Sequence, residues 1–143
     1  MVAIARSYAG CDADDLIQDI LLQVWRSLGS FKKLSSIDTW CYRIALNTAI
    51  SWRRSAERRK QRLPPAESDV GLVPGTDDGC DSSELLLQFL HTLSDTDRAL
   101  VLMYLEDMSG TEMAAILGVG DGALRVRMHR IKQRLAKWEA GDL

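Results

Sequence analysis

Apolar residues recur along this chain at intervals of three or four positions, and no stretch alternates between apolar and polar residues regularly enough to predict a strand. The pattern predicts helices at about 13–28, 39–59, 83–93, 95–106 and 110–117, and a last helix after a glycine-containing turn. Residues 63–82 contain all three prolines and show no helical periodicity. We therefore predict an all-α protein with one small helical domain at 1–62, a flexible acidic linker at 63–82, and a second small helical domain at 83–143.

The helix expected at 13–28 has one apolar side and one mixed side. The predicted core stripe consists of Leu16, Ile17, Ile20, Leu21, Val24 and Leu28, and Asp12 stands where it can cap the helix. Leu22 and Trp25 lie off this stripe, among the polar residues Asp14, Asp15, Gln18 and Arg26. An exposed Leu and Trp beside carboxylates indicate a surface for a partner protein, and a further helix that covers them would explain them equally well.

The helix expected at 39–59 also has two different faces. The predicted inward face carries Tyr42, Ala45, Leu46, Ala49 and Ala56, and the opposite face carries Trp40, Arg43, Asn47, Ser51, Arg54 and Arg58. Arg43, Asn47 and Ser51 form a row that can hold phosphates and reach base edges, and a Trp at its head can stack on an unpaired base. A solvated basic face is the alternative. Because Glu57 is the only acidic residue interleaved with these bases, we favour nucleic-acid binding.

The second domain shows clear helix signals. Two pairs have capping-box spacing, Ser94 with Asp97 and Ser109 with Glu112. The helix at 83–93 is marked by Leu85, Leu86, Phe89, Leu90 and Leu93. Ala115 is small enough for a close helix crossing, and Gly118 can take the left-handed conformation that ends a helix. The order of helix, glycine-containing turn and helix predicts a helix-turn-helix.

The last helix is apolar on one side and basic on the others. Its predicted core residues are Leu124, Met128, Ile131, Leu135 and Trp138, and its outward residues include Arg125, Arg127, His129, Arg130, Lys132, Arg134 and Lys137. His129 has no Cys or His partner near in sequence, so we interpret it as a surface or phosphate-contacting residue. This helix is the second candidate for contact with a polyanion.

Charge along the chain supports two separate basic surfaces. The whole chain carries a net charge of −2, yet residues 40–62 hold seven Lys/Arg and one Glu, and residues 63–84 hold six acidic residues and no base. Residues 121–143 are again basic, with a net charge of +3. Two basic blocks separated by an acidic segment indicate two places of contact with nucleic acid.

The remaining composition argues against several classes of protein. The three cysteines, Cys11, Cys41 and Cys80, are widely spaced, so we expect reduced thiols with neither a metal site nor a disulfide framework. The sequence contains no nucleotide-binding, metalloprotease or serine-hydrolase motif, so we expect neither catalysis nor a cofactor. The first residues lack the features of a signal peptide and no apolar run is long enough to span a bilayer, so we expect a cytoplasmic protein without membrane insertion.

Three stretches together resemble a known family. In order, the chain reads "DADDLIQDILLQVWRSLGSF", "TWCYRIALNTAISWRR" and "LSDTDRALVLMYLEDMSGTEMAAILGVGDGALRVRMHRIKQRL". They resemble bacterial RNA polymerase sigma factors of the sigma-70 family, in particular the small extracytoplasmic-function (ECF) group, which keeps only sigma domains 2 and 4. The resemblance covers nearly the whole chain outside the linker.

The resemblance implies a function and its partners. It implies a protein that binds the clamp helices and flap of core RNA polymerase. It also implies direction to promoters, by recognising and melting the minus-ten element with domain 2 and contacting the minus-thirty-five element with domain 4. The expected partners are therefore core polymerase, double-stranded and melted promoter DNA, and an anti-sigma factor. The implied mechanism is positioning and strand separation without covalent chemistry.

The resemblance also assigns roles to residues. The implied polymerase-binding residues are Asp14, Asp15, Gln18, Asp19, Leu22 and Trp25. The loop from Phe31 to Asp38 resembles the one that captures a flipped base. The implied minus-ten residues are Trp40, Arg43 and Asn47, with Ser51, Arg53, Arg54 and Arg58 toward the upstream phosphates. The implied minus-thirty-five residues are Gly122, Ala123, Arg125, Val126, Arg127, His129 and Arg130.

Two departures from the family pattern bear on these expectations. The family has a further helix before residue 11, and "MVAIARSYAG" leaves most of it out. This predicts an N-terminally shortened domain 2 in which part of the stripe of Leu16, Ile20 and Val24 is uncovered. The recognition helix has Ala123 and Val126 where the family carries hydroxyls. Val126 faces outward, where it can touch a thymine methyl but cannot donate a hydrogen bond, so we expect altered minus-thirty-five reading.

Two other functions remain open at this point. One is a sigma-like decoy that sequesters an anti-sigma factor, which both departures favour. The other is a stand-alone helix-turn-helix regulator, which explains the second domain and leaves the first without a role.

Overall fold

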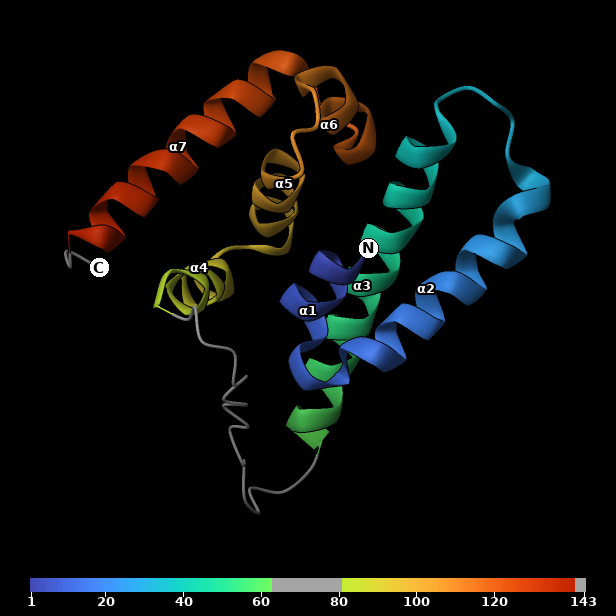
Figure 1. Ribbon diagram of the computed structural model, residues 1–143, viewed down its shortest axis with the longest axis horizontal. Coiled ribbons are helices and arrows are strands. Elements are labelled where there is room, and N and C mark those ends of the chain that lie inside the picture. Colours follow the sequence, from blue (N-terminus) through green and yellow to red (C-terminus); the bar gives the residue numbers. More distant parts are fainter. Residues whose placement is uncertain (63–80, 141–143) are drawn as a thin grey trace. The chain divides into compact units, whose positions relative to one another are not determined.

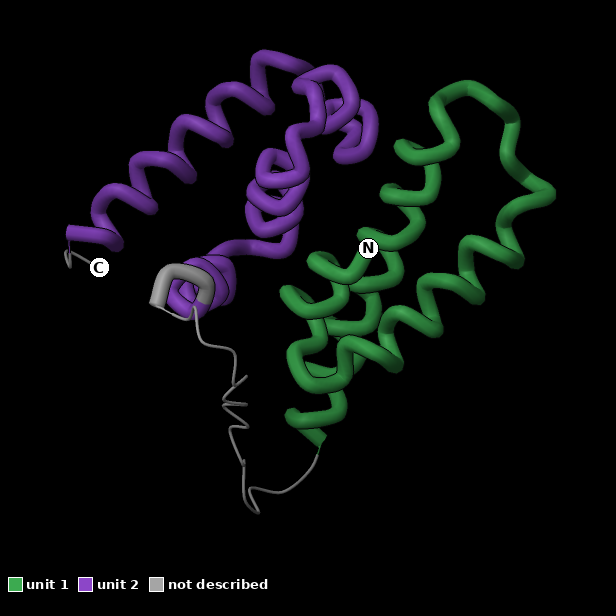
Figure 2. Tube along the Cα trace, viewed as in Figure 1, with its two compact units in different colours: residues 1–77 green, residues 78–143 purple. Residues whose placement is uncertain are grey.

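The structure, a computed structural model, describes residues 1–62 and 81–140, and all the elements that it places there are helices (Figure 1). The chain divides into two compact units, residues 1–77 and 78–143 (Figure 2). The predicted all-α fold with two small helical units is confirmed. Residues 63–80, most of the predicted linker, lie outside the described residues, and the exact domain borders stay predictions.

Unit 1 is built from three helices and two single turns. They are α1 (Val2–Ala9), the 3₁₀ turn η1 (Gly10–Asp12), α2 (Ala13–Ser27), the 3₁₀ turn η2 (Leu28–Ser30) and α3 (Ile37–Arg62). α1 packs against both α2 and α3, and α2 packs along α3 (Figure 1). Each helix therefore contributes one face to a shared core.

The N-terminal segment forms a helix that the sequence analysis did not expect. In α1, Ile4 and Ala5 are fully buried, with Ser7 and Tyr8 beside them, and Leu16 and Ile20 of α2 have no exposed surface. The expectation that part of the stripe of Leu16, Ile20 and Val24 would be uncovered was wrong for Leu16 and Ile20, and Val24 is half-buried. An isolated helix of eight residues is unstable in water, so α1 owes its stability to packing that sequence periodicity does not reveal.

The apolar stripe of α2 is narrower than predicted. Leu16 and Ile20 are buried and Ile17 and Val24 are half-buried, as a core stripe requires. Leu21 and Leu28, however, are 54% and 48% exposed, so their assignment to the core was wrong. Leu21 projects about 140° away from Leu16 around the helix, at about 100° per residue. Leu28 begins η2, where the helix tightens.

The starts of the two long helices of unit 1 differ from the prediction in the cap of α2 and in the first residue of α3. Asp12 occupies the N-cap position of α2 but makes no side-chain capping bond, so its predicted capping role was wrong. α3 begins at Ile37, where the Ser36 Oγ accepts a hydrogen bond from the Thr39 N–H at 3.1 Å. This cap explains why the helix starts before residue 39.

The inward face of α3 is confirmed for most of its members. Tyr42, Ala45, Leu46 and Ala49 are buried, and Ala56 is half-buried. The small or medium side chains of Ala45, Leu46 and Ala49 let α1 and α2 approach α3 closely. The opposite face of the same helix stays outside the core.

Unit 2 contains four helices. They are α4 (Asp81–Thr92), α5 (Asp95–Leu105), α6 (Gly110–Leu117) and α7 (Asp121–Glu139). Its core contains Phe89, Leu90, Leu93, Ala99, Leu100, Met103, Ile116, Leu124 and Ile131. Along α7 the predicted core residues Met128, Leu135 and Trp138 are half-buried, and the Trp138 ring lies 5.9 Å from that of Phe89. Leu85, which marked the predicted helix at 83–93, is 49% exposed.

Capping behaves as predicted in α6 and only in part in α5. The Ser109 Oγ accepts from the Glu112 N–H at 3.2 Å, and the Glu112 carboxylate accepts from the Ser109 N–H at 2.9 Å. The Ser109 hydroxyl and then its N–H hold the pKa of Glu112 below its ordinary value. In α5 the Ser94 Oγ accepts from the Asp97 N–H, but the Asp97 carboxylate pairs with Arg127 of α7 instead of closing the box.

The turn between α6 and α7 has the conformation that was predicted for it. Gly118 has φ 66° and ψ 33°, the left-handed conformation that was predicted to end α6. Ala115 is exposed and its neighbour Ala114 is buried, so the predicted small crossing residue was wrong by one position.

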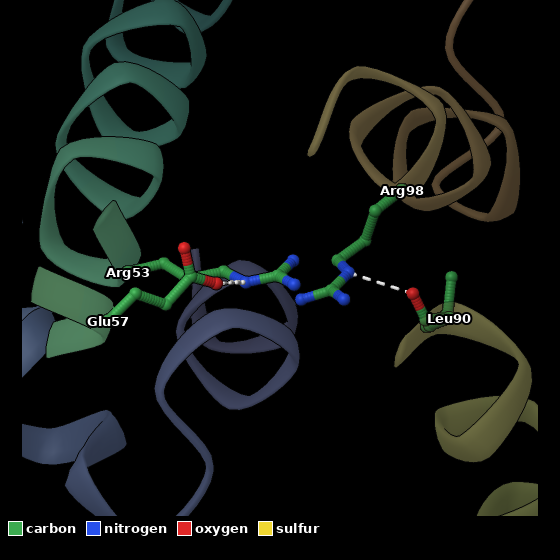
Figure 3. Close-up of polar contacts among 4 residues, drawn as sticks. All are labelled: Arg53, Glu57, Leu90 and Arg98. Atoms are coloured by element: carbon green, nitrogen blue, oxygen red, sulfur yellow. Dashed lines mark hydrogen bonds and ion pairs between the residues drawn. The ribbon is translucent and has the colours of Figure 1, made fainter. Parts of the chain in front are cut away.

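Two arginines fix the C-terminal end of α4 to the rest of unit 2. The Arg98 side chain of α5 is buried, and its Nε donates to the Leu90 carbonyl at 2.9 Å (Figure 3). The Arg134 guanidinium of α7 donates to the Thr92 carbonyl at 3.2 Å. Both bonds satisfy carbonyls in the last turn, where a helix has no partners of its own.

Packing of α1 is the feature of this fold that mutation tests most simply. We predict that Ile4→Ala lowers the local free energy of unfolding of α1–α3 by about 2–5 kcal/mol, because it opens a cavity against α2 and α3. Native-state hydrogen exchange measures this, with peptides of α5–α7 as the internal reference. Val2→Ala is the matched control, since Val2 is 52% exposed and its truncation is expected to cost under about 0.5 kcal/mol. Equal effects of the two variants would contradict the packing of α1.

Candidate nucleic-acid and protein interfaces

The outward face of α3 carries the polar row that the sequence predicted. Arg43, Asn47 and Ser51 are exposed and lie on successive turns of the helix. Trp40 at the head of the row is half-buried, and its ring lies 5.1 Å from that of Phe31 at an interplanar angle of 50°. The loop before α3 therefore holds Trp40 in a defined orientation, a contact that periodicity alone does not predict.

The basic end of α3 is not uniform. Arg54 and Arg58 are exposed, and the Arg58 guanidinium donates to the Ser55 hydroxyl at 3.3 Å. Arg53 is half-buried and its Nε lies 3.0 Å from Glu57 Oε1 (Figure 3). The Arg53 guanidinium is therefore paired with Glu57 on the same helix. The Arg58 side chain is exposed, so an external anion can reach it.

A hollow of about 640 Å³ separates α2 from the C-terminal half of α3. It is lined by Asp19, Gln23, Thr48, Ser51, Trp52, Ser55, Arg58, Arg59 and Arg62. The structure thus brings Ser51 and Arg58 together on one wall and places Asp19 on the other. Trp52, Arg59 and Arg62 were not among the predicted site residues, although the run of bases from 58 to 62 was the signal for two of them.

The outer side of α2 is polar at its start and apolar toward its end. All six predicted partner-binding residues are exposed: Asp14, Asp15, Gln18, Asp19, Leu22 and Trp25. Leu22 is 50% and Trp25 76% exposed, so in the described part of the chain no further helix covers them and that alternative is wrong. Leu21 and Leu28 extend this apolar surface. Contiguous exposed Leu and Trp side chains beside carboxylates are typical of a protein-binding surface.

The outward face of α7 is exposed along its first half. It presents Gly122, Ala123, Arg125, Val126, Arg127, His129 and Arg130. Val126 is 52% exposed, as its predicted outward position requires. The Arg127 Nε lies 3.2 Å from the Asp97 Oδ1 of α5. This ion pair joins the guanidinium to a helix that packs against α7. Asp97 was not a predicted site residue.

Several basic residues of α7 take part in packing. The Lys132 Nζ lies 4.8 Å from the centre of the Tyr104 ring, a cation–π contact, and 3.5 Å from its hydroxyl. Arg134 holds the end of α4, as described above. The basic charge of α7 is therefore divided between an exposed first half and a second half that takes part in packing.

The described residues include two free thiols and no candidate metal site. In 1–62 and 81–140, His, Cys, Asp and Glu side chains nowhere gather in a group of three that could hold a metal ion. Cys11 is an exposed free thiol and Cys41 is half-buried and free, whereas Cys80 lies outside the described ranges. Among the helices described, none is long and apolar enough to cross a membrane.

Comparisons with known proteins agree with this geometry. Residues 1–59 match the family Sigma-70 region 2, and residues 83–135 match the family Sigma-70, region 4. The chain is 33% identical over 133 residues to the RNA polymerase sigma factor YlaC of Bacillus subtilis, across 87% of this chain and 76% of that protein. It is 31% identical over 141 residues to the ECF RNA polymerase sigma-E factor of Haemophilus influenzae, across 87% of this chain and 72% of that protein.

A solved structure shows the same fold. The sigma factor RpoE, in its complex with the anti-sigma factor NepR from Bartonella quintana, matches with a TM-score of 0.78 and 26% identity. The match covers 99% of this chain and 91% of that one.

Two helical units with exposed basic faces, matched in order by regions 2 and 4, define a bacterial RNA polymerase sigma factor. The chain belongs to the ECF group of the sigma-70 family. It therefore acts with core RNA polymerase and promoter DNA.

Proposed function

We propose that three exposed faces divide the work of this sigma factor. The outer side of α2 binds core polymerase, the outer row of α3 recognises and melts the minus-ten element, and the first half of α7 contacts the minus-thirty-five element. The observation that carries this proposal is the same in α3 and α7: a buried apolar side fixes the helix and leaves a polar, basic side exposed.

The role of α2 rests on its exposed apolar surface. Leu22 and Trp25 lie among Asp14, Asp15 and Gln18, so a partner can bury apolar area at the centre and meet carboxylates at the rim. Clamp helices of core polymerase fit this chemistry. Leu21 and Leu28 add to the same surface, which is wider than the family pattern implied.

The role of α3 rests on the order of its residues. Trp40, held by Phe31, offers a ring on which an unpaired base can stack, and stacking of this kind contributes about 1–3 kcal/mol per base. Arg43 and Asn47 follow within reach of base edges, and Arg54 and Arg58 continue toward phosphates. Binding energy from captured bases offsets the few kcal/mol of unstacking, and no covalent step by this chain is needed.

The role of α7 rests on the helix-turn-helix and its outward residues. α6 ends at Gly118, and α7 begins at Asp121 with small residues at its exposed start. Arg125, Arg127 and Arg130 then supply donors and positive charge for phosphates and base edges. RNA synthesis itself belongs to the polymerase.

We further propose an anti-sigma factor as regulatory partner and the cytoplasm as the place of action. The matched sigma factor RpoE was solved with the anti-sigma factor NepR, and here the exposed apolar side of α2 offers a surface for a partner protein. Domains 1–62 and 83–143 are the proposed functional divisions.

A sigma-like decoy is the second candidate. The observation that favours it is the recognition helix, where Ala123 and Val126 replace hydroxyls that the family places against DNA. A stand-alone helix-turn-helix regulator is not supported, because residues 1–59 match sigma region 2.

Start-site mapping separates the initiating factor from the decoy. The protein is mixed with core polymerase and fragmented genomic DNA from its source, and the 5′ ends of the RNA are sequenced. We expect starts clustered downstream of a shared pair of promoter elements. Starts identical to those of core polymerase alone, from a folded protein, would favour the decoy.

The phosphate-binding role of Arg58 predicts a change in salt dependence. Arg58→Gln should lower the slope of log affinity against log salt by about 0.9 for promoter binding by the holoenzyme, because one phosphate contact is lost. Filter binding at several salt concentrations measures it. Arg6→Gln changes the net charge equally at an exposed site of α1 and is expected to leave the slope unchanged. Equal changes in both variants would indicate a general charge effect.

The polymerase-binding role of α2 predicts a loss of affinity without a loss of stability. Trp25→Ala should weaken binding to core polymerase by about thirtyfold, since an aromatic residue at the centre of an interface contributes about 2 kcal/mol. Fluorescence anisotropy with labelled protein measures this, and Val2→Ala provides an equally apolar truncation on α1. Unchanged binding of the Trp25 variant would remove α2 as the docking helix.

A further inference from the structure

A second hollow, of about 400 Å³, lies at the exposed start of the recognition helix. Its lining consists of Val119, Gly122, Ala123, Val126, Arg127 and Arg130. The residues come from the turn after α6 and from the first half of α7, so the hollow occupies the face that is proposed to enter the major groove.

Four of the six lining residues have no polar side-chain atom. Val119, Ala123 and Val126 carry only methyl groups, and Gly122 has no side chain. A Cβ added at Gly122 would meet no atom within 4 Å, so the space beside it is open. A base edge can therefore approach this part of α7 closely, and these four side-chain positions offer it no hydrogen-bond donor.

The other two residues that line the hollow are arginines, and one of them is held in place. Arg127 is held by Asp97 at 3.2 Å, and Arg130 lies one turn further along α7. Apolar side chains beside positive charges suit DNA, because the edges of its base pairs lie between negatively charged phosphates. The two positive charges therefore favour a nucleic acid over an apolar peptide as the occupant of the hollow.

Among the groups that base pairs present in the major groove, the C5-methyl of thymine is the apolar one. The amino donors of cytosine and adenine would lose water beside these residues without gaining a side-chain acceptor, which is unfavourable. We propose that the hollow of Val119, Gly122, Ala123 and Val126 is a thymine-methyl subsite that selects thymine within the minus-thirty-five element. This inference rests on the proposed docking of α7 in that element.

Removal of the methyl alone tests the proposal. Holoenzyme containing the full chain is used with a promoter obtained by start-site mapping, first with the minus-thirty-five element randomised and then with each thymine there replaced by uracil. We expect thymine to be enriched at one or two neighbouring positions, and uracil at those positions to weaken binding about fourfold per methyl. The 5-bromouracil base, whose bromine fills the place of the methyl, should restore binding. Uracil in the spacer between the two elements is the matched DNA control.

Two protein variants test whether the weaker binding of uracil-containing DNA arises at this hollow. Val126→Ser removes both methyls from an exposed side chain and should reduce the uracil effect to less than twofold. Gly122→Ala, for which the structure has room, should do the same by occupying the space beside the helix that a thymine methyl would enter, while favouring the helix.

The outcomes separate this inference from the proposed function. A minus-thirty-five preference without thymine, or with thymine that uracil replaces at no cost, overturns the methyl subsite and leaves the docking of α7 intact. Binding that ignores the minus-thirty-five sequence altogether overturns both.

Discussion

The structure depends on one constraint: a long basic helix is stable only if its opposite side is buried. α3 meets this constraint by burying Tyr42, Ala45, Leu46 and Ala49 against α1 and α2. α7 meets it against α5 and α6, with Leu124 and Ile131 in the core. Because the apolar side is fixed, the polar side cannot turn inward, and each unit presents its basic residues to solvent in a defined order. Contact with DNA is therefore a consequence of how each unit packs.

The two basic helices use their charge differently. In α7, Arg127 is held by Asp97, Lys132 by Tyr104 and Arg134 by the Thr92 carbonyl, so much of the charge is fixed in place. In α3 the outward row begins with an aromatic pair and continues with exposed polar residues. A fixed donor such as Arg127 suits the regular geometry of double-stranded DNA, whereas a stacking platform suits bases that have left the duplex. The net charge of −2 further limits non-specific binding to DNA by the chain as a whole.

Sequence periodicity predicted the elements that have strong local signals. The capping box of Ser109 and Glu112 and the left-handed Gly118 depend on near neighbours, and both were found as predicted. α1 was missed because eight residues carry little periodicity and its stability comes from tertiary packing. The exposure of Leu21 could not be read from the sequence because the breadth of the buried stripe depends on how many helices cover it. The predicted site residues of α2, α3 and α7 are exposed, but the contacts that orient them, such as Phe31 with Trp40 and Asp97 with Arg127, join residues whose pairing no spacing rule specifies.

We propose that α3 opens the promoter while α7 anchors the protein to it. Permanganate reactivity of promoter thymines, with protection of the minus-thirty-five element read on the same holoenzyme complexes, tests this most directly. The variant is Arg43→Ala with Asn47→Ala, since both side chains are exposed and their loss leaves the core intact. We expect reactive minus-ten thymines with the unaltered protein, and loss of that reactivity with protection of the minus-thirty-five element retained in the variant. Unchanged reactivity, or the loss of both signals together, would contradict it.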